Sequence, residues 1–206
     1  SAASDVYKRQ SEYRSQSEQM LVHMINQHFN HPSVILWGLG NENDWPGDFP
    51  SFDKASIHSF MSHLNNLSHQ LDSSRKTTIR RCEFCSDITD VYSPSIWAGW
   101  YGGGMRDYRQ MTEKAIARYP HFLHAEWGGD SHVGRFSERT DLENVIAGDK
   151  NGDWSETYMI HLFDWTLKEQ QMMQNLTGTA FWTFKDFSTP LRPNNPIPYV
   201  NQKGVV

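Results

Sequence analysis

Two glutamates carry the chemistry that this sequence suggests. Glu42 ends the apolar run in HPSVILWGLGNEN, and Glu126 ends the run in FLHAEWGGD. Each run is typical of a buried strand that stops at a carboxylate, and catalytic groups cluster at the carboxyl ends of parallel strands. Hydrolysis of a glycosidic bond needs two carboxyl groups, one to protonate the leaving oxygen and one to attack the anomeric carbon. A single strand-end glutamate is often an ordinary surface residue, but the pair favours catalysis.

The residues beside these glutamates fit the same chemistry. Asn41 precedes Glu42, and at a strand end both side chains can reach one pocket, where an amide could bind a sugar 2-hydroxyl. Glu126 is followed by a tryptophan and two glycines, which permit close approach of a sugar ring. Arg80 and Arg81 lie in a predicted strand, where one of them could orient Glu126 or lower its pKa, although solvation is an equal alternative.

The elements that position these groups alternate between helix and strand, which predicts a parallel sheet. Glu42 and Glu126 lie 84 residues apart. That interval leaves room for two further strands, so we expect the two carboxylates on strands three apart around one rim. About five strands are too few for a closed barrel, which predicts a small open α/β domain or the back part of an eight-stranded barrel. The predicted helices are 18–28, 53–71, 111–119 and 155–174. The predicted strands are 33–40, 77–84, 89–92, 122–127 and 178–187, and 131–153 is a predicted loop.

Composition excludes several other classes of protein. The net charge of −5 with no basic stripe argues against nucleic-acid binding, and no apolar run is long enough to span a membrane. Cys82 and Cys85 form a single CxxC in a predicted strand, where they would point to opposite faces, so we expect neither metal nor redox chemistry there. We expect no metal and no cofactor. Residues 1–17 lack periodicity and are predicted to be non-native or disordered, which leaves 18–206 as the folded domain.

Several segments together resemble glycoside hydrolase family 2, the β-galactosidase, β-glucuronidase and β-mannosidase group. NHPSVILWGLGNE, ending at Glu42, resembles the family's acid/base motif, and LHAEWGG is similar to its nucleophile strand at Glu126. DVYSPSIWAGWY resembles the sixth strand, and GTAFWTFKDF with NQKG resembles the eighth strand and its loop. The resemblance implies a retaining exo-β-glycosidase with a (β/α)8 catalytic domain, of which this chain would hold strands four to eight.

The resemblance also implies a set of substrate-binding residues. Trp97 stands where relatives usually have a tyrosine, which leaves the support of Glu126 open, and Tyr101 matches a later tyrosine of the family. Trp182 is a candidate sugar platform or a core residue. The partners implied are a glycoside or oligosaccharide substrate and further domains and strands of a longer protein, so we expect the chain alone to be inactive. A homo-oligomer is possible, and the compartment stays open among periplasm, cytoplasm and secretion. The predicted substrate-binding set is Asn41, Trp97, Tyr101, Trp182, Asn201 and Lys203.

The identity of the sugar is the least determined prediction. Asn201-Gln-Lys203 is similar to the loop that binds the uronate carboxylate in β-glucuronidases, and an ammonium group facing a carboxylate gives real discrimination. The NQKG stretch, however, is also familiar from β-galactosidases, and a surface lysine after a turn is the plain structural alternative. We therefore predict β-galactosidase-type activity, with β-glucuronidase as the alternative and a non-catalytic carbohydrate-binding relative as a third hypothesis.

Overall fold

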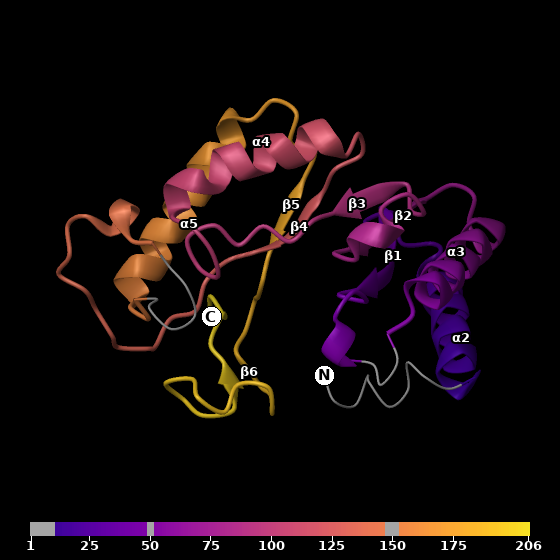
Figure 1. The fold of residues 1–206 in the computed structure, drawn as a ribbon, viewed down its shortest axis with the longest axis horizontal. Coiled ribbons are helices and arrows are strands. Elements are labelled where there is room, and N and C mark those ends of the chain that lie inside the picture. The colour runs from indigo at the N-terminus through magenta and orange to yellow at the C-terminus, as the bar shows by residue number, and fades with distance from the viewer. Residues whose placement is uncertain (1–10, 49–51, 147–152) are drawn as a thin grey trace. The chain divides into compact units, whose positions relative to one another are not determined.

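The computed structural model describes residues 11–48, 52–146 and 153–206 (Figure 1). The chain folds as two compact units, residues 1–94 and 95–206, each with its own strands and helices. No helix in the described ranges is long and apolar enough to cross a membrane. Residues 1–10 of the predicted non-native segment lie outside the described residues, and 11–17 form the first turns of helix α2. The prediction for 1–17 stays a prediction.

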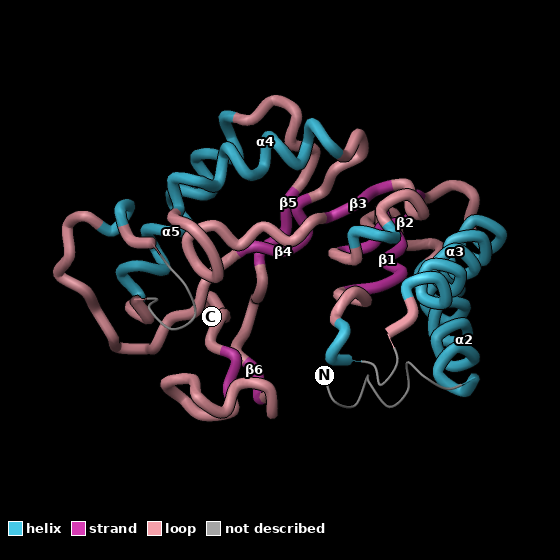
Figure 2. Tube along the Cα trace, viewed as in Figure 1, coloured by secondary structure: helices cyan, strands magenta, loops and turns pink. Residues whose placement is uncertain are grey.

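The first unit is a parallel sheet with helices beside it. Its strands pair in the order β1-β2-β3, and helices α2 and α3 contact each other (Figure 2). Parallel pairing is what the alternation of helix and strand predicted. The elements of this unit are α2 (Ser11–His28), β1 (Leu36–Asn41), the short 3-10 helix η1 (Pro46–Asp48), α3 (Lys54–Leu71), β2 (Lys76–Arg80), η2 (Glu83–Cys85) and β3 (Val91–Ser93).

Helix α3 forms where the apolar periodicity places it. Asp53 caps its start by accepting a hydrogen bond from Ala55 N at 3.0 Å. Phe60, Met61 and Leu64 are buried, and their spacing of three and four residues places them on one face of the helix. Ser51, a second residue of a type that caps helices, lies outside the described residues.

Strand β2 is shorter than predicted, and this changes the position of the two cysteines. The strand ends at Arg80 because Arg81 and Cys82 adopt left-handed backbone angles, with φ of 57° and 72°. The chain then turns through η2, which brings the Cys82 and Cys85 sulfurs to 3.1 Å. Both cysteines are fully buried. The expectation that they point to opposite faces is wrong, since the strand has already ended.

The second unit contains two smaller sheets. Strands β4 and β5 pair in parallel, and the two-residue strands β6 and β7 pair antiparallel. The predicted last strand, 178–187, is not continuous: β5 covers three of its residues, and its last residue, Phe187, begins β6. The elements here are η3 (Met105–Asp107), α4 (Tyr108–Arg118), β4 (His124–Trp127), η4 (Leu142–Asn144), α5 (Glu156–Met172), β5 (Thr179–Phe181), β6 (Phe187–Ser188) and β7 (Val200–Asn201).

An aromatic core holds the second unit together. Trp97, Trp100 and Tyr158 are buried in one cluster with Met105 and Leu162. Tyr158 donates a hydrogen bond to Gly99 O at 2.5 Å, which ties α5 to the segment after β3. The fold is therefore α/β with parallel strands, and the described strands do not form a closed barrel. Their assignment as strands four to eight of a barrel stays a prediction.

Candidate active site

Glu42 follows the end of β1 and has a left-handed backbone, with φ of 55°. The register between β1 and β2 shifts between Gly38 and Gly40, so β1 bulges shortly before its end. Glu42 N donates to Arg80 O at 3.1 Å, which anchors the turn to the neighbouring strand. A left-handed glutamate is unusual, and such conformations occur preferentially at functional sites.

The side chains of Asn41 and Glu42 meet at one guanidinium. Arg80 Nη1 donates to Glu42 Oε1 in a short contact and lies 3.4 Å from Asn41 Oδ1. Neighbouring residues can face the same group here because the strand bulges and then ends. Arg80 itself is buried, so the alternative that it is solvated is wrong.

A second arginine and a tryptophan complete the surroundings of Glu42. Arg81 pairs with Asp44 at 3.1 Å, lies 3.6 Å from Glu42 Oε1, and stacks 3.9 Å from the centroid of the Trp45 ring. Trp45 Nε1 donates to Glu42 Oε2 at 3.3 Å. Both carboxylate oxygens of Glu42 therefore have partners within the first unit. Trp45 was not among the predicted site residues.

These partners favour the ionised form of Glu42. Burial raises its pKa, but the hydrogen bond and charge of Arg80 oppose burial and prevail, helped by Arg81 and Trp45. The net effect is a pKa below the ordinary value. A lowered pKa keeps this carboxylate ionised, so its use as a general acid requires a pH low enough to protonate it.

In the second unit, Glu126 lies on β4 beside the end of β5. Gly128 follows with φ of 149°, and a Cβ placed there would lie 2.7 Å from Trp182 O. Trp182 N donates to Trp127 O at 2.7 Å, so the chain at Trp182 lies against the end of the Glu126 strand. Trp182 is 40% exposed, which makes it available to a ligand rather than part of the core.

Lys203 is buried, with 2% of its surface exposed, so the alternative that it is a surface lysine is wrong. Its Nζ forms a short ion pair with Asp130, which is also 2% exposed. The ammonium lies 4.9 Å from the ring centroid of Tyr101, 5.7 Å from Trp97 and 5.9 Å from Trp100. A buried ion pair surrounded by ring faces is costly to assemble, so it deserves a functional explanation.

Burial lowers the pKa of Lys203, and the Asp130 carboxylate opposes this shift. The charge of Glu126 also acts on Lys203 and favours the ammonium form, so the predicted nucleophile lies within electrostatic range of this cation. Asn201 Oδ1 accepts a hydrogen bond from Lys203 N at 3.2 Å. Asn201 therefore shapes the loop that carries Lys203.

Trp97 and Tyr101 pack against each other beside this cation, with ring centroids 5.0 Å apart at 66°. Tyr101 Oη accepts a hydrogen bond from Arg192 Nη2 at 2.7 Å. Burial raises the pKa of Tyr101 to about 12, assisted by the charge of Asp130, so the phenol stays protonated near neutral pH. The structure brings the predicted residues Trp97, Tyr101, Asn201 and Lys203 into one cluster, which we call the Lys203 cluster.

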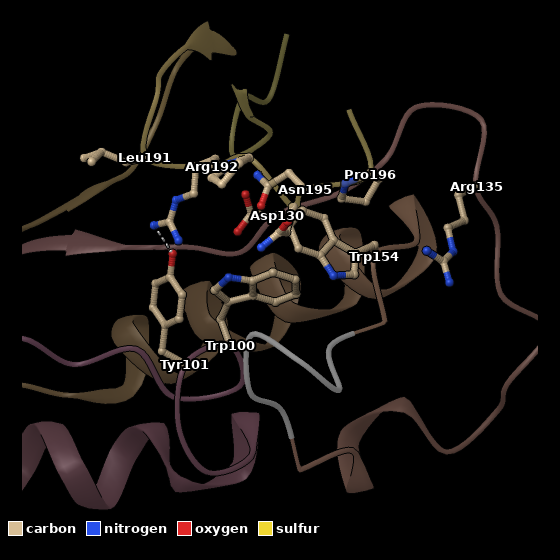
Figure 3. Close-up of a pocket in the computed structure, with 11 residues that line it drawn as sticks. Trp100, Tyr101, Asp130, Arg135, Trp154, Leu191, Arg192, Asn195 and Pro196 are labelled. Carbon is tan, nitrogen blue, oxygen red and sulfur yellow. Dashed lines mark hydrogen bonds between the residues drawn. The ribbon is translucent and has the colours of Figure 1, made fainter. Parts of the chain in front are cut away.

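Two residues of this region were missed by sequence reasoning, and both appear in Figure 3. Asp130 lies four residues after Glu126, and a carboxylate so close to the predicted nucleophile was a usable signal. Arg192 lies in a proline-rich loop without periodicity and gave no signal. Among the described residues no group of three or more histidine, cysteine or carboxylate side chains could hold a metal ion. The predicted separation of about 5–5.5 Å between the two catalytic carboxyl groups stays a prediction.

Comparison with known proteins places these residues in a recognised family. Residues 2–197 match the model described as glycosyl hydrolases family 2, TIM barrel domain. A putative β-glucuronidase of Formosa agariphila is 46% identical over 94% of this chain and 26% of its own length. Two solved structures are also similar, β-glucuronidase 3 of Bacteroides uniformis (62% identity, TM-score 0.91) and the β-glucuronidase of Parabacteroides merdae (55%, 0.90). Each alignment covers 96% of this chain, and 26% and 27% of the respective solved chains. The chain thus spans about a quarter of the length of these proteins.

Proposed function

This chain belongs to glycosyl hydrolase family 2, and from that premise we propose that it forms part of the catalytic domain of a retaining β-glucuronidase. The relatives described above, with 46–62% identity, are named β-glucuronidases, in one case as putative. They favour the alternative prediction over β-galactosidase-type activity, which we predicted first. Asn201-Gln-Lys203 is the sequence feature that pointed to this alternative.

The observation that carries the proposal is the burial of Lys203. A uronate carboxylate presented to this ammonium group would form a charge-assisted hydrogen bond shielded from water. A galactoside presents a neutral hydroxymethyl group instead and would leave the desolvated cation without that interaction. Asp130 would keep Lys203 charged and in place while the site is empty.

The two glutamates would perform a double displacement. In the first step Glu126 attacks the anomeric carbon while the protonated Glu42 gives its proton to the leaving oxygen. In the second step Glu42 accepts a proton from water, and that water displaces Glu126 from the glycosyl ester. Asn41 would bind the sugar 2-hydroxyl beside Glu42, and Trp182 would offer its exposed ring to the sugar.

Hydrolysis of aryl glycosides by a full-length protein carrying this chain tests the proposal. We expect turnover of p-nitrophenyl β-glucuronide to exceed that of the β-galactoside by at least about 100-fold, as expected for a site built around a charged partner. Lys203→Ala should remove most of this preference. Lys168→Ala is the matched control, because Lys168 is exposed and pairs with Asp164 on the surface of α5. A preference for the galactoside that survives Lys203→Ala would refute the proposal.

A further inference from the structure

A cavity of about 690 Å³ adjoins the Lys203 cluster within the second unit. Figure 3 shows Tyr101 and Arg192 at one end and Arg135 at the other, with Asp130 and Trp154 between them. The cavity shares Tyr101 with the Lys203 cluster, and Asp130 connects the two through its ion pair with Lys203. Glu126, Trp182 and Lys203 do not line it. The cavity is therefore beside the proposed uronate site rather than part of it.

The size and lining of the cavity suit a further sugar. Pockets of about 300–1,000 Å³ hold drug-sized ligands, and a sugar unit added to a uronate needs space of this order. Trp154 contacts Trp100 edge to face, with centroids 5.2 Å apart at 81°, so the wall offers aromatic surface. Aromatic side chains beside polar groups are well suited to sugar rings, which have apolar faces and polar edges.

Arg135 places an unpaired cation at the far end of this cavity. Its backbone is fixed, because its N–H donates to His132 O at 3.0 Å and its carbonyl accepts from Glu156 N at 2.8 Å. Its guanidinium has no hydrogen-bond or ion-pair partner among the described residues. Arg139 on the same loop differs, because it forms two hydrogen bonds with Asp141 at 3.1 Å. Arg135 is therefore positioned by its backbone and left available by its side chain.

Asp130 gives a second, independent sign of a ligand. Its Oδ2 binds Lys203, but its buried Oδ1 has no hydrogen-bond partner in the described part of the chain. Buried carboxylate oxygens normally have partners, and a missing one often marks a place for water or a ligand. A sugar hydroxyl is a donor of the right kind.

We propose that this cavity is a second sugar subsite, in which Arg135 binds an anionic group on the sugar next to the uronate. The anion is a sulfate or a carboxylate, since a guanidinium forms paired hydrogen bonds with either. Asp130 Oδ1 accepts a hydrogen bond from a hydroxyl of the substrate, and Trp154 contacts its ring. The substrate class is thus an acidic oligosaccharide rather than a glucuronide of a small neutral alcohol. This inference rests on the proposed function.

The test compares three β-glucuronosyl disaccharides whose second sugar is neutral, sulfated or a uronate. With a full-length protein carrying this chain, we expect kcat/KM for at least one acidic disaccharide to exceed that for the neutral one. Arg135→Ala should lower this ratio about 10-fold, the effect of losing about 1.4 kcal/mol of binding. Arg139→Ala should leave the ratio unchanged. The acidic disaccharide whose kcat/KM falls toward that of the neutral one in Arg135→Ala identifies the anion as sulfate or carboxylate.

Binding measured by calorimetry in a Glu126→Gln background separates this inference from the proposed function. Weaker binding of an acidic disaccharide after Arg135→Ala, with the neutral one unaffected, supports the subsite even if no glucuronide is hydrolysed. A protein that hydrolyses p-nitrophenyl β-glucuronide but treats all three disaccharides alike refutes the subsite alone. An equal effect of Arg135→Ala on neutral and acidic disaccharides also refutes it.

Discussion

The buried ion pair between Lys203 and Asp130 makes a quantitative prediction about stability. Both side chains are 2% exposed, so replacing Lys203 with methionine leaves a buried carboxylate without its ion-pair partner. Removal of one partner of such a pair costs about 3–5 kcal/mol, whereas replacing both partners is often close to neutral. We therefore expect Lys203→Met to lower the free energy of unfolding by about 3–5 kcal/mol, with a lower unfolding midpoint as a result.

The double variant Lys203→Met/Asp130→Asn separates stability from recognition. It should recover most of the stability lost in Lys203→Met, because no unpaired charge remains. It should not recover turnover of p-nitrophenyl β-glucuronide, because the proposed carboxylate partner is still missing. Thermal unfolding followed by circular dichroism, with kinetics on the same samples, measures both effects in the full-length protein. Additive and small losses of stability, below about 1 kcal/mol, would show that the pair is not buried as described.

Three further predictions follow from individual contacts. Arg80→Gln removes the main group that lowers the pKa of Glu42, so the protonated form of Glu42 persists to higher pH. The alkaline limb of the kcat/KM profile should therefore move to higher pH. A limb that stays at the same pH contradicts the role of Arg80. Gly128→Ala places a methyl group against Trp182 O and should lower the free energy of unfolding, measured by urea titration, by about 1–3 kcal/mol. Gly38→Ala is the control and should lower it less, because a Cβ at Gly38 meets nothing within 4 Å. Equal losses for the two variants would contradict the close approach of Gly128 to Trp182. The 206-residue chain expressed alone should not hydrolyse any of these glycosides, because the strands in the described part of the chain do not close a barrel. Measurable turnover by the isolated chain would overturn this expectation.

Much of the local structure was predictable because it depends on short-range patterns. The sequence predicted a helix over 53–71, and the observed helix α3 begins directly after its cap Asp53. The end of β1 at Asn41 and Glu42 was readable from the apolar run that stops there. In each case neighbouring residues alone determine the outcome.

The features that were missed depend on contacts between distant residues. Nothing in TTIRRCEFC marks a left-handed turn at Arg81 and Cys82, since neither is glycine, so the strand was predicted too long. Lys203 is 73 residues from Asp130, and no sequence pattern reveals that the two are buried together. Without that burial, Asn-x-Lys could not outweigh the resemblance of NQKG to β-galactosidases, so β-galactosidase-type activity was predicted first, whereas the relatives of 46–62% identity favour the β-glucuronidase alternative.

Trapping of the glycosyl–enzyme intermediate tests the central claim most directly. An activated 2-fluoro-glucuronide should slow the second step and leave one sugar on the nucleophile, which mass spectrometry of a proteolytic digest can locate. We predict a single uronyl adduct on Glu126, formed in the full-length protein and absent in Glu126→Gln. The corresponding 2-fluoro-galactoside should label the protein far more slowly. Attachment of the uronyl group to another residue, or faster labelling by the galactoside, would contradict the account.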